Sequence, residues 1–204
     1  PKVIPIHVGR QLFVDDFLID TSTLQRKYYY PEPYVGNPIL KPQTKIEKNE
    51  GCCPVAATFT DGVFYDSKDG LYKMWYQAGW FDGTAYAESL DGQNWYRPDL
   101  DVVPGTNMVL PFRKGYKRDG ATVWIDHETK DPKSRYKLFV FFRKNEVEEI
   151  GELYISSDGI HWNGPTITGP CGDASSFFYN PFRKKWVFSI RKVDVEGDFH
   201  YRYR

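Results

Sequence analysis

One pattern of short apolar segments recurs along this chain and constrains its fold more than any other feature. Residues 119–162 contain an acid before an apolar segment, a second apolar segment, and a third that ends in a turn closed by Trp. Three such segments also occur, in the same order, earlier in the chain at residues 63–95. The pattern begins again later, at residues 172–192. No long stretch shows helical periodicity, so the segments are predicted to be strands and the protein to be all-β.

A repeat of this length made of short strands is typical of a β-propeller, in which each repeat forms one blade. We predict blades at about 50–98, 117–165 and 170–204, with a long connection at 99–116 between the first two. An N-terminal strand and an extended, proline-rich lead-in are expected in residues 1–49.

The predicted blades are too few to close a ring. The chain supplies about two and a half to three blades, whereas propellers close with four or more. An open ring leaves strand edges unpaired, which folded proteins avoid. We therefore expect a single incomplete propeller domain, completed by a missing segment or by a second chain. The start at Pro1 rather than Met fits either a removed signal peptide or the choice of expressed segment, and the former predicts a secreted or periplasmic protein.

Charge and composition exclude several classes of function. The 27 basic and 27 acidic residues balance and form no basic stripe, so nucleic acid is not an expected partner. No apolar run approaches the roughly 20 residues that span a bilayer, so no membrane is expected either. Cys52, Cys53 and Cys171 show neither a disulfide framework nor a zinc-ligand spacing, so no metal or cofactor is expected. The abundant aromatic residues fit half-buried strands and also the apolar faces of sugar rings.

Four short motifs carry a resemblance to a known group of proteins. They are N-P-I-L-K-P at 37–42, Y-K-M-W-Y at 72–76, A-x-S-x-D-G-x-x-W at 87–95, and R-D-G-x-x-V-W-I-D at 118–126. Together they resemble the five-bladed propeller glycosidases of families 43, 32, 68 and 130, and most of all uncharacterised bacterial glycosidase-like proteins that begin L-F-V-D-D. The resemblance implies an oligo- or polysaccharide substrate whose glycosidic bond is cleaved or transferred in a central funnel.

Sugar cleavage needs one carboxylic acid to protonate the leaving oxygen and a second carboxylate as nucleophile or base. Asp119 is the first candidate, because Arg118-Asp119 stands where the group has R-D-P; a strand-capping turn is its alternative role. Asp173 is the equivalent residue of the third repeat, where the group commonly has Glu. Asp16 is the third candidate, because an unpaired acid in an apolar strand is costly to bury unless it lines the funnel or pairs with an Arg.

Four further residues are predicted to bind substrate. Arg118 belongs to the motif just described, and Arg143 and Arg191 each end the second strand of a repeat. Facing inward, these arginines would orient the acids or a substrate group, whereas surface ion pairs are the alternative. Glu50 precedes the first inner strand, and its alternative role is a solvated charge.

Two turns, 89–95 and 156–162, resemble the Asp-box of sialidases but are one residue shorter between Asp and Gly. We predict a structural role, in which the Asp accepts backbone N–H bonds and the Trp packs inward. The functions that compete with a glycosidase are a non-catalytic carbohydrate-binding propeller and a sialidase-like enzyme, which would need a cluster of inward arginines and a Tyr nucleophile.

Overall fold

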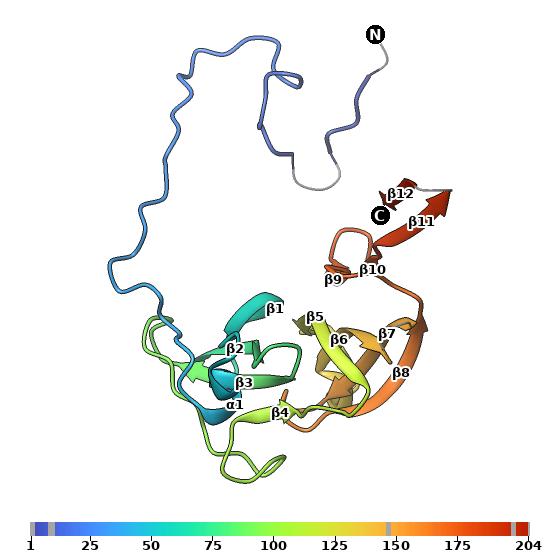
Figure 1. Ribbon diagram of the computed structural model, residues 1–204. Helices are drawn as coiled ribbons and strands as arrows, with labels where there is room; N and C mark the ends of the chain where they lie inside the picture. Colours follow the sequence, from blue (N-terminus) through green and yellow to red (C-terminus); the bar gives the residue numbers. More distant parts are fainter. Residues whose placement is uncertain (1–2, 8–10, 146–147, 197–198, 204) are drawn as a thin grey trace.

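The computed structural model describes residues 3–7, 11–145, 148–196 and 199–203, and antiparallel β-sheet dominates this part of the chain (Figure 1). The elements are α1 (Lys45–Lys48), the 3-10 turns η1 (Asn49–Gly51) and η2 (Pro132–Ser134), and the strands β1 (Ala56–Asp66), β2 (Leu71–Ala78), β3 (Gly83–Ser89), β4 (Met108–Leu110), β5 (Tyr116–Ile125), β6 (Tyr136–Lys144), β7 (Glu148–Ser156), β8 (Asn163–Gly169), β9 (Ser176–Asn180), β10 (Lys185–Ser189), β11 (Lys192–Glu196) and β12 (Phe199–Tyr203).

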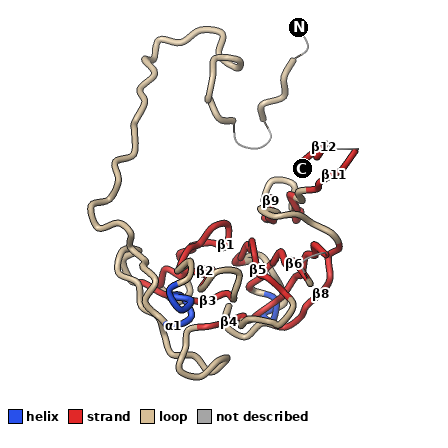
Figure 2. Tube along the Cα trace, in the orientation of Figure 1, coloured by secondary structure: helices blue, strands red, loops and turns tan. Residues whose placement is uncertain are grey.

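The strands form sheets in strict chain order. β1 to β4 make one four-stranded antiparallel sheet and β5 to β8 make a second, while β9 pairs with β10 and β11 pairs with β12 (Figure 2). The prediction of an all-β protein is confirmed, and within the described residues α1 is a single four-residue turn of helix. No helix in the described ranges is long and apolar enough to cross a membrane.

The fourth strand of each sheet differs from the sequence prediction. β4 lies inside the stretch 99–116 expected as a connection, and β8 continues past residue 165, where the second blade was expected to end. β4 has three residues and meets β3 through two residue pairs, so its sequence carries almost no strand pattern. β8 is an edge strand that contains Pro165 and is mostly exposed, which removes the apolar alternation a buried strand would show.

The expected N-terminal strand is absent from the described residues. Residues 11–44 contain no strand, only bends, turns and irregular backbone, and in Figure 1 the first part of this segment extends away from the sheets, whereas Leu40 near its end packs against the first sheet. The Asp15 side chain accepts the N–H of Phe17 at 3.0 Å, and Ile19 N–H donates to the Asp16 carbonyl at 3.0 Å. These local bonds close a turn in place of a strand ladder, which is the usual effect of Asp in such a position.

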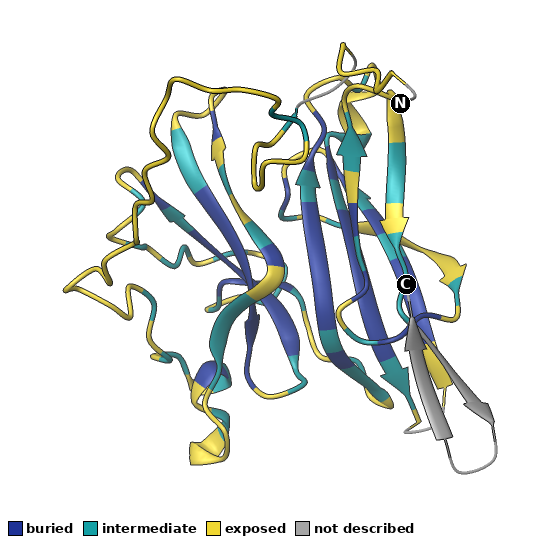
Figure 3. Cartoon of the chain, turned by 90° about the horizontal axis from the view of Figure 1, so that it is seen from above, coloured by how far each residue is buried: buried dark blue, intermediate teal, exposed yellow. Residues whose placement is uncertain are grey.

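Alternation along β2 explains how the sheets stack. Met74 and Tyr76 face one side, where they pack with Ala85 and Met108, while Trp75 faces the other side, toward the second sheet. All of these side chains are buried, and Figure 3 shows burial concentrated in the central strands. A strand that is apolar on both faces belongs to a sheet that is covered on both faces.

The second sheet packs against both of its neighbours. Trp75 of the first sheet donates its indole N–H to the Gly159 carbonyl at 2.7 Å, and its ring lies 5.7 Å from that of Tyr136. On the other side, the Phe139 ring lies 6.2 Å from that of Phe177 in β9. Successive sheets are therefore stacked face to face.

The first strands of successive sheets lie next to one another. Thr60 in β1 donates its hydroxyl hydrogen to the Ala121 carbonyl of β5 at 2.6 Å, and β5 in turn contacts β9. This arrangement brings the start of each repeat to a common place.

Candidate functional site

A cavity of about 210 Å³ lies where the three first strands approach one another. It is lined by residues from β1, from β5 and from the turn before β9, namely Phe59, Thr60, Asp119, Gly120, Asp173 and Ala174. The cavity therefore brings together Asp119 and Asp173, the two acids that the sequence repeat singled out.

Irregular backbone places the side chains around the cavity. The β5–β6 register slips between Arg118 and Ala121, so β5 bulges at Asp119, and the β1–β2 register slips between Ala57 and Gly62. A bulge bends the strand and turns a side chain out of the ladder, and bulges are frequent beside active sites.

Two non-glycine residues of the lining have positive φ, Phe59 at 35° and Ala174 at 54°. Such backbone costs of order 1–3 kcal/mol per residue and persists only where surrounding structure enforces it.

Each cavity acid is paired with an arginine of its own repeat. Arg143 Nη2 donates to Asp119 Oδ2 at 2.6 Å, and Arg191 Nη1 forms an ion pair with Asp173 Oδ1. The side chain of Asp119 is 24% exposed and that of Asp173 is 39% exposed, so both carboxylates remain open to a ligand.

Backbone bonds dock the link between β10 and β11, which carries Arg191, onto the turn that carries Asp173. Gly172 N–H donates to the Arg191 carbonyl at 2.7 Å, and Arg191 N–H donates to Ser175 Oγ at 2.9 Å. The Asp173–Arg191 pair is thus held by the main chain on both sides.

Arg118 lies beneath the cavity rather than in it. Its guanidinium is fully buried, pairs with Asp61, and donates to Gln77 Oε1 and to the Asp119 carbonyl, each at 3.2 Å. Burial lowers the pKa of Arg118, and the negative charge of Asp119 opposes this effect. Arg118 therefore contacts the backbone of a cavity acid and is screened from any ligand.

Asp61 was not among the predicted site residues, although the chain carries a local signal for it. Asp61-Gly62 lies in the middle of β1 and Asp119-Gly120 lies in β5, so both strands carry an Asp-Gly pair at the bulge, although the strand registers align Asp61 with Ala121 and not with Asp119. Asp61 is completely buried, and its Oδ2 has no hydrogen-bond partner within the described residues.

The other predicted site residues lie elsewhere. Asp16 forms an ion pair with Arg26 in the N-terminal segment, and its side chain is 80% exposed. Glu50 is exposed, with φ 53°, in the turn that follows α1. A cavity of about 650 Å³ includes Asp16 but is lined only by residues within 13–26, so no sheet contributes to it.

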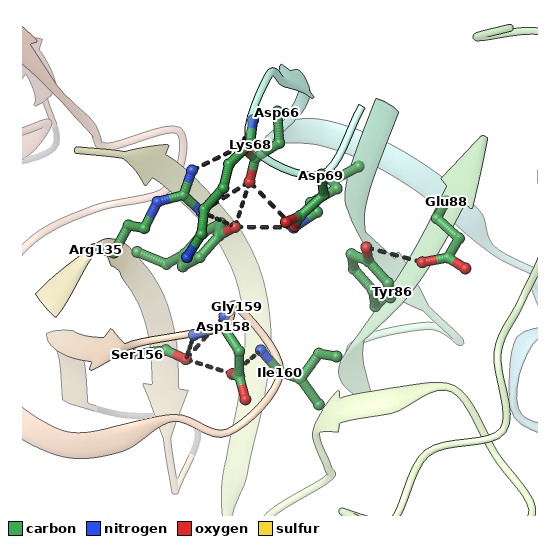
Figure 4. Close-up of polar contacts among 12 residues, drawn as sticks. Asp66, Lys68, Asp69, Tyr86, Glu88, Arg135, Ser156, Asp158, Gly159 and Ile160 are labelled. Carbon is green, nitrogen blue, oxygen red and sulfur yellow. Dashed lines mark hydrogen bonds and ion pairs between the residues drawn. The ribbon is translucent and has the colours of Figure 1, made fainter. Parts of the chain in front are cut away.

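The opposite ends of the strands carry a buried charge cluster around Asp66 (Figure 4). Its carboxylate accepts from Arg135 Nη2 at 2.6 Å, from Tyr136 Oη at 2.5 Å and from Lys73 Nζ at 3.1 Å. Arg135, acting against burial, lowers the pKa of Asp66. The cluster joins the two sheets, because Asp66 and Lys73 belong to the first and Arg135 and Tyr136 to the second.

The Asp-box-like turns have the structural role predicted for them. Asp158 Oδ1 accepts the N–H of Ile160 at 2.8 Å, and Ser156 Oγ accepts Gly159 N–H at 2.9 Å (Figure 4). Asp158 Oδ1 also accepts the N–H of His161 at 2.9 Å. Burial raises the pKa of Asp158, but His161 and the backbone donors outweigh it and lower the pKa to about 2.

The first turn repeats these bonds with Asp91, and Trp95 and Trp162 pack against the apolar clusters of their sheets. Among the described residues, no group of three or more His, Cys, Asp or Glu is placed to hold a metal ion.

This chain is distantly similar in structure to a carbohydrate-processing enzyme of known structure. No protein-family model matches the chain, and no curated protein matches it. The crystal structure of an N-acetylgalactosamine deacetylase from F. plautii, in complex with blood group B trisaccharide, is similar with a TM-score of 0.40 and 16% sequence identity. The likeness covers 63% of this chain and 38% of that chain, so this chain spans less than half of that enzyme's length and no family is assigned.

Proposed function

We propose that this chain belongs to a carbohydrate-active enzyme that hydrolyses or transfers a glycosidic bond, with Asp119 and Asp173 as its paired carboxylates. One observation carries the proposal: two acids from equivalent positions of successive repeats line the same cavity, each beside an arginine. Glycosidic-bond cleavage requires two carboxyl groups at one site. One protonates the leaving oxygen, and the other attacks the sugar carbon or activates water.

We also propose that the stacked sheets are consecutive blades of an incomplete propeller. The support is the meander order of each four-stranded sheet, the face-to-face packing, and the adjacency of the first strands β1, β5 and β9. In this proposal the first blade reaches β4 and the second reaches β8, and a further segment or a second chain completes the ring.

The two arginines beside the cavity acids are proposed to position those acids and to contact the sugar. Arg143 and Arg191 hold the carboxylates toward the cavity, and guanidinium groups also hydrogen-bond sugar hydroxyls. Arg143 Nε is buried with no hydrogen-bond partner among the described residues, which marks a donor that the protein itself does not use.

The competing function is a carbohydrate-binding protein without catalysis. It is favoured by the ion pairs themselves, since both cavity acids already have arginine partners. Sugar release separates the two functions, because a chain that binds sugar without forming product supports only the non-catalytic binding protein.

The test compares Asp119→Asn and Asp173→Asn variants in release of sugar from aryl glycosides and from arabino-, manno- and fructo-oligosaccharides. Each variant is expected to lose a factor of about 10²–10⁴ in kcat while keeping its circular dichroism spectrum. The matched control is Asp101→Asn, whose side chain is 79% exposed and contacts His161 instead of the cavity.

Substrates with different leaving groups assign the two roles. A variant that lacks the general acid retains activity on aryl glycosides with a good leaving group, because these need no protonation. Added azide restores turnover only where the lost carboxylate acted as nucleophile or base. Unchanged turnover in Asp119→Asn removes Asp119 from the catalytic pair.

A further inference from the structure

The β2–β3 hairpin carries two neighbouring aromatic residues at its tip, Trp80 and Phe81. Their ring centroids lie 4.6 Å apart, and Trp80 is 47% exposed. The ends of the loop are joined by the Ala78–Gly83 pair of the β2–β3 ladder. Phe81 is half-buried and supports the exposed ring of Trp80, which contributes little to the core and is free to contact a ligand.

The loop is held rigidly in this position. Gly79 N–H donates to the Val55 carbonyl at 3.0 Å, and Gly79 has φ +81°. A Cβ at Gly79 would lie 2.9 Å from the Ile46 carbonyl oxygen, so only glycine fits there. Phe81 has φ 55°, which an aromatic residue rarely adopts without enforcement by its surroundings. A pre-ordered aromatic surface binds without the entropy cost of ordering a loop.

A single side chain links this loop to the cavity acids. The Arg143 guanidinium carbon lies 5.6 Å from the Phe81 ring centroid, and Arg143 Nη2 lies 2.6 Å from Asp119 Oδ2. On the cavity side, Phe59 adds a further aromatic ring that is 65% exposed. Aromatic rings therefore lie next to the acid–arginine pair, with Phe81 beside Arg143 and Phe59 in the cavity lining.

The cavity is smaller than the ~300–1,000 Å³ typical of small-molecule sites, at about 210 Å³. A ligand longer than one sugar unit must therefore extend over the rim. Sugar rings present polar edges and apolar C–H faces, so carboxylates and arginines suit the unit in the cavity and an aromatic face suits the next unit.

We propose that the loop at residues 79–82 is a stacking subsite, in which Trp80 binds the sugar unit adjacent to the unit held by Asp119 and Arg143. This inference rests on the proposed function and deepens it, since it makes the substrate class an oligosaccharide of at least two units. It adds a specificity-determining residue outside the cavity.

Calorimetric titration with arabinotriose, mannotriose and kestose, and with arabinose, mannose and fructose, tests the inference. In the full chain, the preferred trisaccharide is expected to bind more tightly than its monosaccharide. Trp80→Ala is expected to weaken trisaccharide binding about tenfold and to leave monosaccharide binding within about twofold, since one stacking contact is lost. Trp80→Tyr is expected to restore most of the affinity.

The control is Tyr96→Ala, because Tyr96 is 63% exposed on the same sheet but pairs with Glu88 near the far end of β3. An equal loss for trisaccharide and monosaccharide in Trp80→Ala overturns the subsite, as does wild-type chain that binds no trisaccharide more tightly than its monosaccharide. The catalytic proposal fails separately, when trisaccharide binds at Trp80 but no product is released.

Discussion

The side chains of Arg118 and Asp61 form an ion pair that is completely shielded from solvent beneath the cavity. Asp61 comes from β1 and Arg118 from β5, so the pair joins the first strands of two successive sheets. Arg118 also donates to the Asp119 carbonyl at 3.2 Å, which connects the buried pair to the backbone of a cavity acid.

Removing one partner of this pair should cost more than removing both. Asp61→Leu or Arg118→Met alone is expected to lower the free energy of unfolding by about 3–5 kcal/mol, because a buried charge is left without its counter-charge. The double variant Asp61→Leu/Arg118→Met is expected to lose less than either single variant. Urea unfolding measures all three, and additive losses would show that the two charges do not depend on each other.

Glycine at position 159 should be required for the contact between the two four-stranded sheets. A Cβ there would lie 2.6 Å from the Trp75 ring, and Gly159 has φ +82°. Gly159→Ala is expected to destabilise the fold by about 2–4 kcal/mol, combining left-handed strain with overpacking. Gly70→Ala is the matched control, because Gly70 has φ +70° with open space around it and should lose only about 1 kcal/mol. Equal losses in thermal unfolding would contradict a packing role.

The Asp-box-like turn should behave as a structural cap. Asp158→Ala is expected to cost about 1–2 kcal/mol, because Asp158 Oδ1 accepts two backbone N–H groups. Asp158→Asn retains an acceptor oxygen and should cost less. Both variants are expected to bind and process sugars like the wild type, so a selective loss of sugar binding with intact stability would argue against the structural role.

Asp66 should make part of the stability depend on acid pH. Arg135 lowers the pKa of the folded carboxyl below the ordinary value of about 3.9, so this contribution is present above pH ~4 and is lost as pH falls toward the folded pKa. Asp66→Asn is expected to lose about 3 kcal/mol near neutral pH. The gap to wild type should narrow by about 1 kcal/mol at pH ~3, where the unfolded carboxyl protonates. Urea unfolding at both pH values checks this, and a constant gap would rule out the linkage.

Local sequence was enough to place most of the strands. The recurring apolar segments located β1, β2 and β3, and the same pattern located β5, β6 and β7. β4 and β8 were missed because a short strand and an exposed edge strand carry no apolar repeat. The N-terminal strand was wrongly expected because Asp15 closes a local turn.

The sequence predicted only part of the candidate site. The repeat pointed to Asp119 and Asp173, which do line one cavity, but it did not distinguish an exposed acid from a buried one. Asp61, in the Asp-Gly pair of β1, lies buried against Arg118, which was itself expected to contact substrate. Asp16 was predicted to line the site because its neighbours are apolar. It lies instead in the N-terminal segment, where it pairs with Arg26.

The sequence by itself determined the strand pattern, the repeat and the acids at the starts of the second and third repeats, because these follow from neighbouring residues along the chain. Tertiary structure alone decided which acids share a cavity, which arginine each one meets, and which pair is buried. Those outcomes depend on how β9 and the two bulged strands β1 and β5 approach one another, and contacts between residues such as Asp61 and Arg118 leave no periodic signal in the chain.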